Sequence, residues 1–300
     1  MNDNDSHAGS AVRNSPELKT TTDVPAVEGG WYSAGKKHAR RVLITLPAFN
    51  EAEAISPLLE RIIESMLGTE LGWRVVVVDD GSTDRTAELA RRFSERFPVE
   101  VIRHKKNSGL GAALNTCFRE AVARCGNDDC IVLLDADNTQ PPELIPQLVE
   151  RIEAGSDVVI ASRFRPGANV QGVPAHRHLL SLGARVIFTT AFPIRGVRDY
   201  TCGFRIYRAS VLREALAEYG DKFVSERGFS CMVDVLLKLR GKGLAFDEIP
   251  IDLRYDQKGG VSKMKVLSTI GRTLGLVARR RFGSAKSAND SGSRAEIMMD

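Results

Sequence analysis

Alternation of short apolar runs with amphipathic segments is the feature that most restricts the folds open to this chain. The apolar runs are rich in β-branched residues and occupy residues 42–46, 74–78, 99–103, 130–134 and 157–161. Between them, apolar residues recur at helical spacing over residues 50–67, 83–97, 109–125 and 141–154. Strands that are apolar on both faces and alternate with helices form parallel sheets covered on both sides. The sequence therefore predicts an α/β fold, with a mostly parallel central sheet and helices on both faces.

The rest of the chain divides around one such domain. Its 300 residues are 43% hydrophobic and 27% charged, an ordinary globular composition that is sufficient for a full core. Residues 41–262 are predicted to form this domain. Residues 1–40 and 284–300 are polar, lack apolar periodicity and are predicted to be disordered. The formal net charge of +4 is mild, and it requires no nucleic-acid partner.

Cysteine usage and the N-terminus indicate a cytoplasmic protein. The five cysteines are odd in number and include no Cys-x-x-Cys spacing, as expected for reduced thiols. The first residues lack the basic and apolar regions of a signal peptide. No run approaches the roughly 20 apolar residues that a membrane-spanning helix requires. We therefore expect a cytoplasmic chain that is not integral to a membrane but is still able to lie on its cytoplasmic face.

Two aspartates, Asp135 and Asp137, follow the apolar run at residues 130–134. In open parallel sheets, ligands bind beyond the carboxyl ends of the strands, so this position favours a site. Two neighbouring carboxylates raise each other's pKa unless a cation neutralises them, and hard oxygen ligands suit Mg²⁺ or Mn²⁺. Such a metal would bridge a diphosphate and stabilise it as a leaving group. The alternative is a solvated turn with two acids, which the strand-end position disfavours.

A second acidic strand end spans residues 79–84, with the sequence DDGSTD. A carboxylate here can accept hydrogen bonds from the N–H of a nucleobase or from ribose hydroxyls, and Gly81 permits a tight turn. We expect Thr83 and Asp84 to cap the following helix rather than to bind a ligand.

A third strand end spans residues 47–51, with the sequence PAFNE. Pro47 is predicted to end the strand, and Phe49 is suited to lie against a flat base. Glu51 falls in the first turn of a predicted helix, where the helix dipole alone also favours an acid. Further on, Gly109 and Gly111 open another helix and let a backbone approach a ligand, but they lack the extension of a dinucleotide-binding fingerprint.

Taken in order, these motifs resemble the inverting glycosyltransferases of family two, which have the GT-A nucleotide-sugar fold. More narrowly, the chain resembles the dolichol- or polyprenyl-phosphate mannosyltransferase branch of that family. The matching stretches extend over most of the predicted domain, at residues 47–51, 76–84, 109–113, 135–142, 161–164, 199–205 and 262–264. The resemblance implies a transferase that depends on Mg²⁺ or Mn²⁺ and takes a GDP- or UDP-linked sugar as its donor.

The resemblance also implies a role for each matching position. Contacts with the nucleotide-sugar would come from Pro47, Phe49, Glu51, Val78, Asp80, Asp135, Ala136, Asp137, Arg163 and Lys263. Within this set, Asp135 and Asp137 would serve the metal and the diphosphate. Arg163 and Lys263 would approach a phosphate of the donor or of the acceptor.

The chain departs from the family pattern at two places. Relatives often carry a glutamine two residues after the second aspartate as an extra metal ligand; here that place is Thr139, and Gln140 follows. Relatives also carry an arginine six residues before the lysine of Ser-Lys; here that place is Gln257, with Lys258 and Arg254 nearby. The second departure leaves the acceptor-side phosphate contacts open, and with them the acceptor itself.

The acceptor decides whether the enzyme needs a general base. A sugar hydroxyl must lose a proton during attack, and Asp234, on a helix predicted at residues 232–239, or Glu226 would then be the base. A lipid phosphate is already largely ionised, because a phosphate monoester has a second pKa of about 6, and it needs cations instead. Candidate cations lie between the fifth apolar run and residue 205, at Arg163, Arg165, His176, Arg177, His178, Arg195, Arg198 and Arg205.

The C-terminal segment at residues 263–283 predicts a basic amphipathic helix. Its apolar residues recur at three- and four-residue steps, and three consecutive arginines, at residues 279–281, stand near its end. Such a helix either lies in a membrane interface or packs its apolar face on the catalytic domain.

We therefore expect a metal-dependent inverting glycosyltransferase that moves a sugar from a nucleotide-sugar to a polyprenyl phosphate. Its candidate catalytic residues are Asp135, Asp137, Arg163 and Asp234. Transfer to a hydroxyl of a glycan or small molecule is the enzymatic alternative. A nucleotide-sugar-binding regulator without turnover is the alternative from another class, and the intact pair of metal-binding acids disfavours it.

Overall fold

The structure is a computed structural model that describes residues 30–33, 40–173, 175–226, 228, 230–255 and 275, with the backbone alone at 175–180. The segments predicted at residues 1–40, 263–283 and 284–300 lie almost wholly outside this part of the chain. The expected disorder and the expected amphipathic helix therefore stay predictions.

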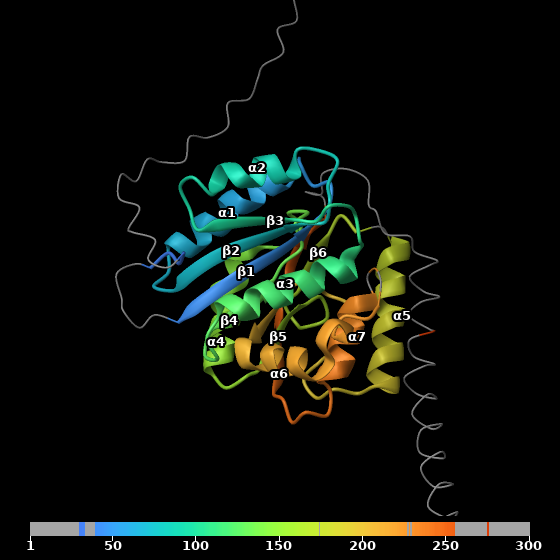
Figure 1. Ribbon diagram of the computed structural model, residues 1–300. Coiled ribbons are helices and arrows are strands. Elements are labelled where there is room, and N and C mark those ends of the chain that lie inside the picture. Colours follow the sequence, from blue (N-terminus) through green and yellow to red (C-terminus); the bar gives the residue numbers. More distant parts are fainter. Residues whose placement is uncertain are drawn as a thin grey trace, which may run out of the picture.

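A sheet forms the centre of the molecule (Figure 1). It has seven strands in the order β3-β2-β1-β4-β7-β5-β8. Its strands are β1 (Arg41–Ala48), β2 (Gly72–Asp79), β3 (Val99–Arg103), β4 (Cys130–Leu133), β5 (Val158–Ser162), β7 (Arg205–Arg208) and β8 (Phe246–Pro250). Neighbouring strands are parallel except at β7, which runs antiparallel to both β4 and β5. A separate parallel pair joins β6 (Asn169–Gln171) to β9 (Asp252–Arg254). The predicted mostly parallel sheet is confirmed, and the predicted strands are β1 to β5.

Helices cover both faces of this sheet, as predicted. They are α1 (Ile55–Leu67), α2 (Thr86–Phe93), α3 (Leu110–Arg124), α4 (Ile145–Glu153), α5 (Ala175–Ala191), α6 (Ala209–Tyr219) and α7 (Ser230–Leu239), with 3₁₀ turns η1 (Pro142–Leu144) and η2 (Gly220–Lys222). Val42 and Ile44 of β1 belong to the core layer that contains α1 and α4, whereas Leu43 belongs to the layer that contains α3, α6 and α7. Within the described residues, none of the helices has the length and apolar character needed to cross a bilayer.

Three predicted boundaries were wrong. α1 begins at Ile55 rather than at residue 50, because Asn50 adopts a positive φ of 54° that a helix does not allow. α2 begins at Thr86 rather than at residue 83. Pro47 does not end its strand, since β1 continues to Ala48. The nitrogen of Pro47 faces the side of β4, and β4 pairs with β1 only as far as Thr45, so no hydrogen bond is lost there.

Parallel strands bring the predicted site residues to one edge of the sheet. The carboxyl ends of β1, β2, β4 and β5 point the same way, and the three acidic or polar segments that follow β1, β2 and β4 therefore lie at the same edge. Because β7 runs in the opposite direction, the residues that precede it, at 199–204, reach this edge as well. The fold thus adds a segment to the site that the parallel-sheet rule alone did not predict.

Candidate functional site

Asp135 and Asp137 follow β4, and their neighbours in sequence hold both carboxylates in place. Gln140 Oε1 accepts the backbone N–H of Asp135 at 3.1 Å, and Gln140 Nε2 donates to Asp135 Oδ2 at 2.7 Å. Asp137 Oδ1 accepts the backbone N–H of Thr139 at 3.2 Å and its hydroxyl at 2.7 Å. Thr139 and Gln140 are each only 4% exposed. The two residues that depart from the family pattern therefore orient one carboxylate each.

The loop that carries these residues is also fastened from two distant elements. Asn138 adopts a positive φ of 56°, and Arg61 of α1 donates from Nη1 to its side-chain oxygen at 2.8 Å. Arg61 is itself paired with Glu143 through Nε at 3.0 Å and Nη2 at 2.9 Å. On the other side, the backbone N–H of Arg254, at the end of β9, donates to the carbonyl of Thr139 at 3.0 Å. The loop after β4 is therefore held by hydrogen bonds from α1 and β9 rather than being a solvated turn.

Gly203, which precedes β7, makes room for the carboxylate of Asp135. A Cβ atom at this position would lie 2.8 Å from Asp135 Oδ1 and 2.9 Å from Oδ2. Real Cβ atoms do not approach other atoms so closely, so only glycine fits against the carboxylate in its present position. No special role was predicted for Gly203, because its function depends on the antiparallel course of β7.

The two carboxylates fit a divalent cation that shares its coordination with a ligand. Among the residues that the structure describes, no group of three or more His, Cys, Asp or Glu side chains could hold a metal ion. Mg²⁺ typically binds through one or two protein carboxylates and completes its octahedron with phosphate oxygens and water. Asp135 and Asp137 supply the right number and type of oxygen ligands for such a shared site. A closed structural metal site is not formed by this part of the chain.

Asp80, directly after β2, anchors the loop that opens α3. Its carboxylate accepts the backbone N–H groups of Ser108 at 3.0 Å and Gly109 at 2.7 Å. Asp80 Oδ1 also lies 2.7 Å from Nδ1 of His104, whose Nε2 is 2.9 Å from the hydroxyl of Thr116. His104 was not singled out from the sequence. The register of β2 and β3 pairs Asp79 with Arg103, and the residues that follow them, Asp80 and His104, therefore lie side by side. Knowledge of this register would have identified His104.

The other positions predicted to contact a nucleoside lie on the adjoining ends of β1 and β2. The strand register pairs Pro47 directly with Val78. Glu51 follows in the loop before α1, where its backbone N–H donates to the hydroxyl of Thr86 at 2.8 Å. Phe49 lies between Pro47 and Glu51 on the same segment. The structure thus brings these positions together beside Asp80, and their contact with a nucleoside stays a prediction.

Hydrogen bonds fasten the loop after β1 to the loop after β2. The side chain of Asn50 accepts the backbone N–H of Thr83 at 2.8 Å, and the backbone N–H of Asn50 donates to the hydroxyl of Ser82 at 2.8 Å. Asp84 accepts the backbone N–H of Thr86, the first residue of α2, at 3.0 Å. The expectation of a helix cap was therefore wrong for Thr83, which binds the neighbouring loop instead, whereas Asp84 does serve the start of α2.

Gly111 was expected to let a backbone approach a ligand, and that expectation was wrong. The space beside its Cα is filled by the carbonyl of Glu226 from the loop between η2 and α7. The same loop is fastened to α3 by Asn115, which accepts the backbone N–H of Val224 at 3.2 Å and donates to its carbonyl at 3.0 Å. The second glycine of this pair therefore serves packing within the chain.

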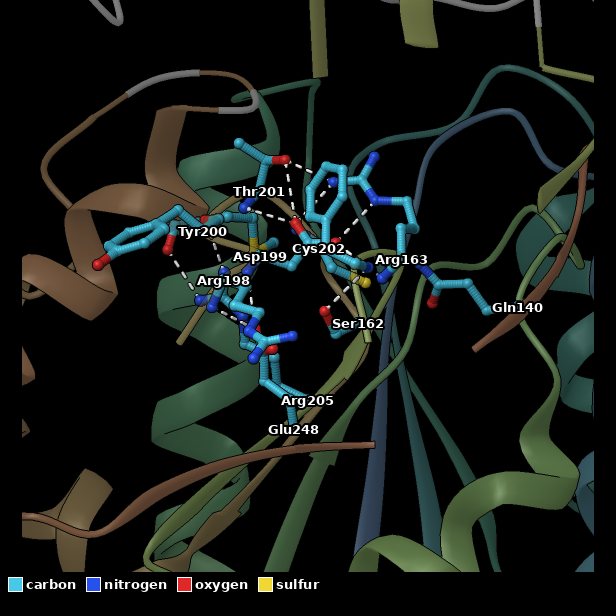
Figure 2. Close-up of polar contacts among 12 residues, drawn as sticks. Gln140, Ser162, Arg163, Arg198, Asp199, Tyr200, Thr201, Cys202, Arg205 and Glu248 are labelled. Carbon is cyan, nitrogen blue, oxygen red and sulfur yellow. Dashed lines mark hydrogen bonds and ion pairs between the residues drawn. The ribbon is translucent and has the colours of Figure 1, made fainter. Parts of the chain in front are cut away.

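Arg163 follows β5 and is bound side-on by Asp199 (Figure 2). Asp199 Oδ2 accepts Nε at 2.8 Å and the backbone N–H of Arg163 at 3.1 Å, and Oδ1 accepts Nη2 at 2.7 Å. Nη2 also donates to the hydroxyl of Thr201 at 2.6 Å. Burial alone would lower the pKa of Arg163, but the adjacent Asp199 outweighs it and raises this pKa. For Asp199, burial alone would raise the pKa, but Arg163 outweighs it and lowers this pKa.

The remaining predicted cations fall into three groups. Arg195 and Arg198 are exposed, and Arg165 donates from Nε to the carbonyl of Glu248 at 2.9 Å. Arg205 is fully buried and donates to the carbonyls of Met232 and Tyr200, each at 2.8 Å, so it packs inside the domain. Lys263 lies outside the described part of the chain, and so do the side chains of His176, Arg177 and His178.

Asp234, the first predicted base, lies on α7 in a fully buried ion pair with Lys238, 2.7 Å from Nζ to Oδ2. Its Oδ2 also accepts the backbone N–H of Ser225 at 2.9 Å and the hydroxyl at 2.8 Å. Burial alone would raise the pKa of Asp234, but Lys238 outweighs it and lowers this pKa. A carboxylate stabilised in its ionised form by these donors is a weak base. The geometry gives Asp234 a structural role between α7 and the preceding loop.

The sequence of this chain matches one family of glycosyltransferases and several of its curated members. Residues 43–216 match the model of the family described as Glycosyl transferase family 2. The dolichol-phosphate mannosyltransferase of Pyrococcus furiosus is 36% identical over 226 residues, which are 75% of this chain and 59% of that protein. The polyprenol monophosphomannose synthase of Mycolicibacterium smegmatis is 31% identical over 227 residues, 75% of this chain and 81% of that protein. This chain thus spans less than two thirds of the Pyrococcus protein but most of the mycobacterial one.

A solved structure shows the same fold. The glucosyl-3-phosphoglycerate synthase from Mycobacterium tuberculosis, in complex with Mn²⁺, uridine diphosphate and phosphoglyceric acid, matches with a TM-score of 0.59. The match covers 81% of this chain and 79% of that chain at 20% sequence identity. At that identity the likeness establishes the fold alone, and the predicted GT-A fold is confirmed.

Proposed function

The chain belongs to glycosyltransferase family 2, and from that membership we propose that it transfers a sugar from a nucleotide-sugar to a polyprenyl phosphate, with inversion at the anomeric carbon. Of two curated relatives, one at 36% identity is named a dolichol-phosphate mannosyltransferase. The other, at 31% identity, is named a polyprenol monophosphomannose synthase. The choice of a phosphate acceptor rests on the ion pair that Asp234 forms with Lys238. This buried ion pair makes Asp234 a poor base, and a phosphate acceptor needs no base.

The chain's residues would divide the work between donor and acceptor. Asp135 and Asp137 would hold a Mg²⁺ or Mn²⁺ ion, which when bound neutralises charge on the leaving diphosphate. Arg163 would donate to a phosphate oxygen, and Lys263 would do the same from the C-terminal segment. A phosphate oxygen of the acceptor attacks the anomeric carbon from the side opposite the diphosphate, a C–O bond forms, and the bond to the donor phosphate breaks. No proton has to be removed, because the acceptor phosphate is already ionised near neutral pH.

Contacts with the nucleoside would come from the adjoining loops after β1 and β2. Pro47 lies near the end of β1, with Phe49 and Glu51 in the loop that follows it, and Val78 lies near the end of β2, with Asp80 directly after that strand. The hydrogen bonds between the loops fix their relative position before a ligand binds, which reduces the entropy lost on binding.

A donor-by-acceptor panel tests this proposal. The purified full chain, with Mn²⁺, is incubated with radiolabelled GDP-mannose, UDP-glucose or UDP-GlcNAc and either a short polyprenyl phosphate or a soluble sugar. We expect label in the organic phase with the polyprenyl phosphate and one of the three donors. Label on a hydroxyl acceptor and none on the polyprenyl phosphate would overturn the acceptor assignment while leaving the family assignment intact.

Asp234→Asn is expected to leave transfer to the polyprenyl phosphate within a few-fold of the parent, per folded molecule. Stability should fall by about 1.5–3 kcal/mol, because Lys238 loses its charged partner. Steady-state kinetics and thermal unfolding measure the two effects separately. A loss of transfer of 100-fold or more in a protein that remains folded would instead identify Asp234 as a base and favour a hydroxyl acceptor.

A further inference from the structure

Arg163 uses only part of its guanidinium group to bind Asp199 and Thr201. Those contacts engage Nε, Nη2 and the backbone N–H. Among the described residues, no hydrogen bond or ion pair engages Nη1. The side chain of Arg163 is 22% exposed, whereas that of Asp199 is completely buried. The edge of the guanidinium formed by Nε and Nη2 is therefore fixed by buried Asp199, and the two N–H donors on Nη1 are left for a ligand.

Asp199 is itself held more firmly than the arginine it binds. The backbone N–H groups of Asp199 and Arg198 donate to Glu248 Oε1 of β8 at 2.7 Å and 2.6 Å (Figure 2). Asp199 Oδ1 also accepts the backbone N–H groups of Thr201 at 3.2 Å and Cys202 at 3.0 Å. Both the backbone and the carboxylate of Asp199 are thus fixed by the fold before Arg163 is considered.

A second carboxylate, that of Asp135, lies near the same segment, since it packs against Gly203, two residues after the Thr201 that binds Arg163 Nη2. Asp135 also acts to raise the pKa of Arg163, although less than Asp199 does. If Asp199 were absent, the long and flexible side chain of Arg163 would gain from turning toward Asp135. There it would neutralise a carboxylate that we assign to the metal, and it would compete with the cation.

We infer that Asp199 is a positioning residue, which holds Arg163 away from Asp135 and presents its Nη1 to a phosphate oxygen. This inference rests on the proposed function only in requiring a phosphate and a metal at the site. The Asp199 carboxylate acts through Arg163 and does not itself touch the ligands. The phosphate can belong to the donor or to the acceptor, and the experiment below distinguishes the two.

The first test replaces Asp199 with asparagine, which keeps the shape but cannot accept both guanidinium donors. Affinity for Mn²⁺, titrated by its paramagnetic signal in the presence of GDP or UDP, should fall by about 10-fold, a typical loss when the support of a metal ligand is removed. Transfer, as kcat/KM, should fall on the order of 100-fold, because a reacting group is displaced by about 1 Å. A raised donor KM with an unchanged acceptor KM assigns the phosphate to the donor, and the reverse assigns it to the acceptor.

The matched control is Asp129→Asn. Asp129 binds Arg41 by the same side-on geometry, at 3.1 Å to Nε and 2.6 Å to Nη2, but at the opposite end of the strands. Losing this pair should leave Mn²⁺ affinity and both KM values near those of the parent. Any effect of Asp199→Asn beyond that of Asp129→Asn is therefore specific to the site.

A double variant separates positioning from general damage. In Asp199→Asn with Arg163→Ala, no guanidinium remains to compete for Asp135, so Mn²⁺ affinity should recover to within about 2-fold of the parent while transfer stays low. Thr201→Val removes the hydroxyl that accepts from Arg163 Nη2 and donates to Asp199 Oδ1, but it keeps the bonds between Arg163 and Asp199. It should weaken Mn²⁺ affinity in the same direction by a smaller factor, and it serves as the test if Asp199→Asn does not fold. Unchanged Mn²⁺ affinity in Asp199→Asn, or no recovery in the double variant, overturns the inference. If the polyprenyl phosphate failed as an acceptor, the inference would still stand, because the Mn²⁺ measurement does not involve an acceptor.

Discussion

Asp137→Asn is expected to reduce sugar transfer by about 1,000-fold, because a metal-held diphosphate gains several kcal/mol of charge stabilisation in the transition state. The substitution keeps the hydrogen-bond acceptor that Thr139 uses, at 2.7 Å, so the loop after β4 should keep its conformation. The loss should appear mainly as weaker Mn²⁺ affinity, and it should be partly recovered at high Mn²⁺. Transfer and donor hydrolysis measured across a Mn²⁺ titration check both expectations.

The matched control for this substitution is Asp128→Asn. Asp128 is an exposed aspartate just before β4, at the other end of the same strand, and among the described residues its one hydrogen bond is from Arg40 to its carbonyl. We expect it to behave like the parent. If Asp137→Asn also left transfer and hydrolysis unchanged in the presence of Mn²⁺, the metal assignment would be wrong.

The central strands could be predicted from the sequence because burial on both faces leaves a strong signal. β1, β2, β4 and β5 lie at apolar runs rich in β-branched residues and are buried along most of their length, whereas the edge strand β3 is only partly buried and contains Glu100. β7 gave no such signal, since its four residues, Arg205–Arg208, begin and end with arginine. Arg205 is tolerated in the core only because carbonyls of Tyr200 and Met232 accept its hydrogen bonds. The antiparallel strand, and with it the approach of residues 199–204, therefore depends on contacts that a local pattern does not contain.

The helix starts were mispredicted for a related reason. Residues 50–54 and 83–85 have a composition that a helix tolerates, but their polar groups bind each other across the two loops. Asn50, for example, binds Thr83 and Ser82 and adopts a positive φ. Local propensity is a weak prior, and here hydrogen bonds between residues 32 and 33 positions apart outweigh it.

In the site too, some residues could be predicted from local sequence and others depend on contacts between distant segments. Asp135 and Asp137 could be found from the rule that ligands bind at the carboxyl ends of parallel strands, without knowledge of a single contact. The residues that hold Arg163 and Asp80 in place could not be found in this way. Asp199 acts on Arg163 from 36 positions away, and His104 lies 24 positions from Asp80. Asp199 did belong to a recognised motif, but its role becomes apparent only once β7 is known to return toward β4 and β5.

Gly203→Ala is the second substitution with a large expected effect, and it tests the position of Asp135 without altering any charge. The new Cβ would lie 2.8 Å from Asp135 Oδ1 and 3.1 Å from Cγ, so the carboxylate has to move. Gln140 resists that movement through its 2.7 Å bond to Oδ2, so the displacement should break this contact or rotate the carboxylate. Gly203 does not have a positive φ, and alanine therefore adds no backbone strain of its own. The damage should be confined to the metal carboxylate.

We therefore expect Gly203→Ala to weaken Mn²⁺ binding and to lower kcat/KM by about 10- to 100-fold, the range typical of disturbed metal-ligand support, with only a small change in the thermal midpoint. Gly183→Ala is the control, because a Cβ at Gly183 of α5 meets nothing within 4 Å and alanine favours a helix. Mn²⁺ titration, kinetics and thermal unfolding on both variants separate an effect on the site from an effect on the fold. Normal Mn²⁺ affinity in Gly203→Ala would mean that the metal does not use Asp135 in this position. Asp137 and ligand oxygens would then have to hold the ion, and Asp199 would have no metal-binding carboxylate to protect from Arg163.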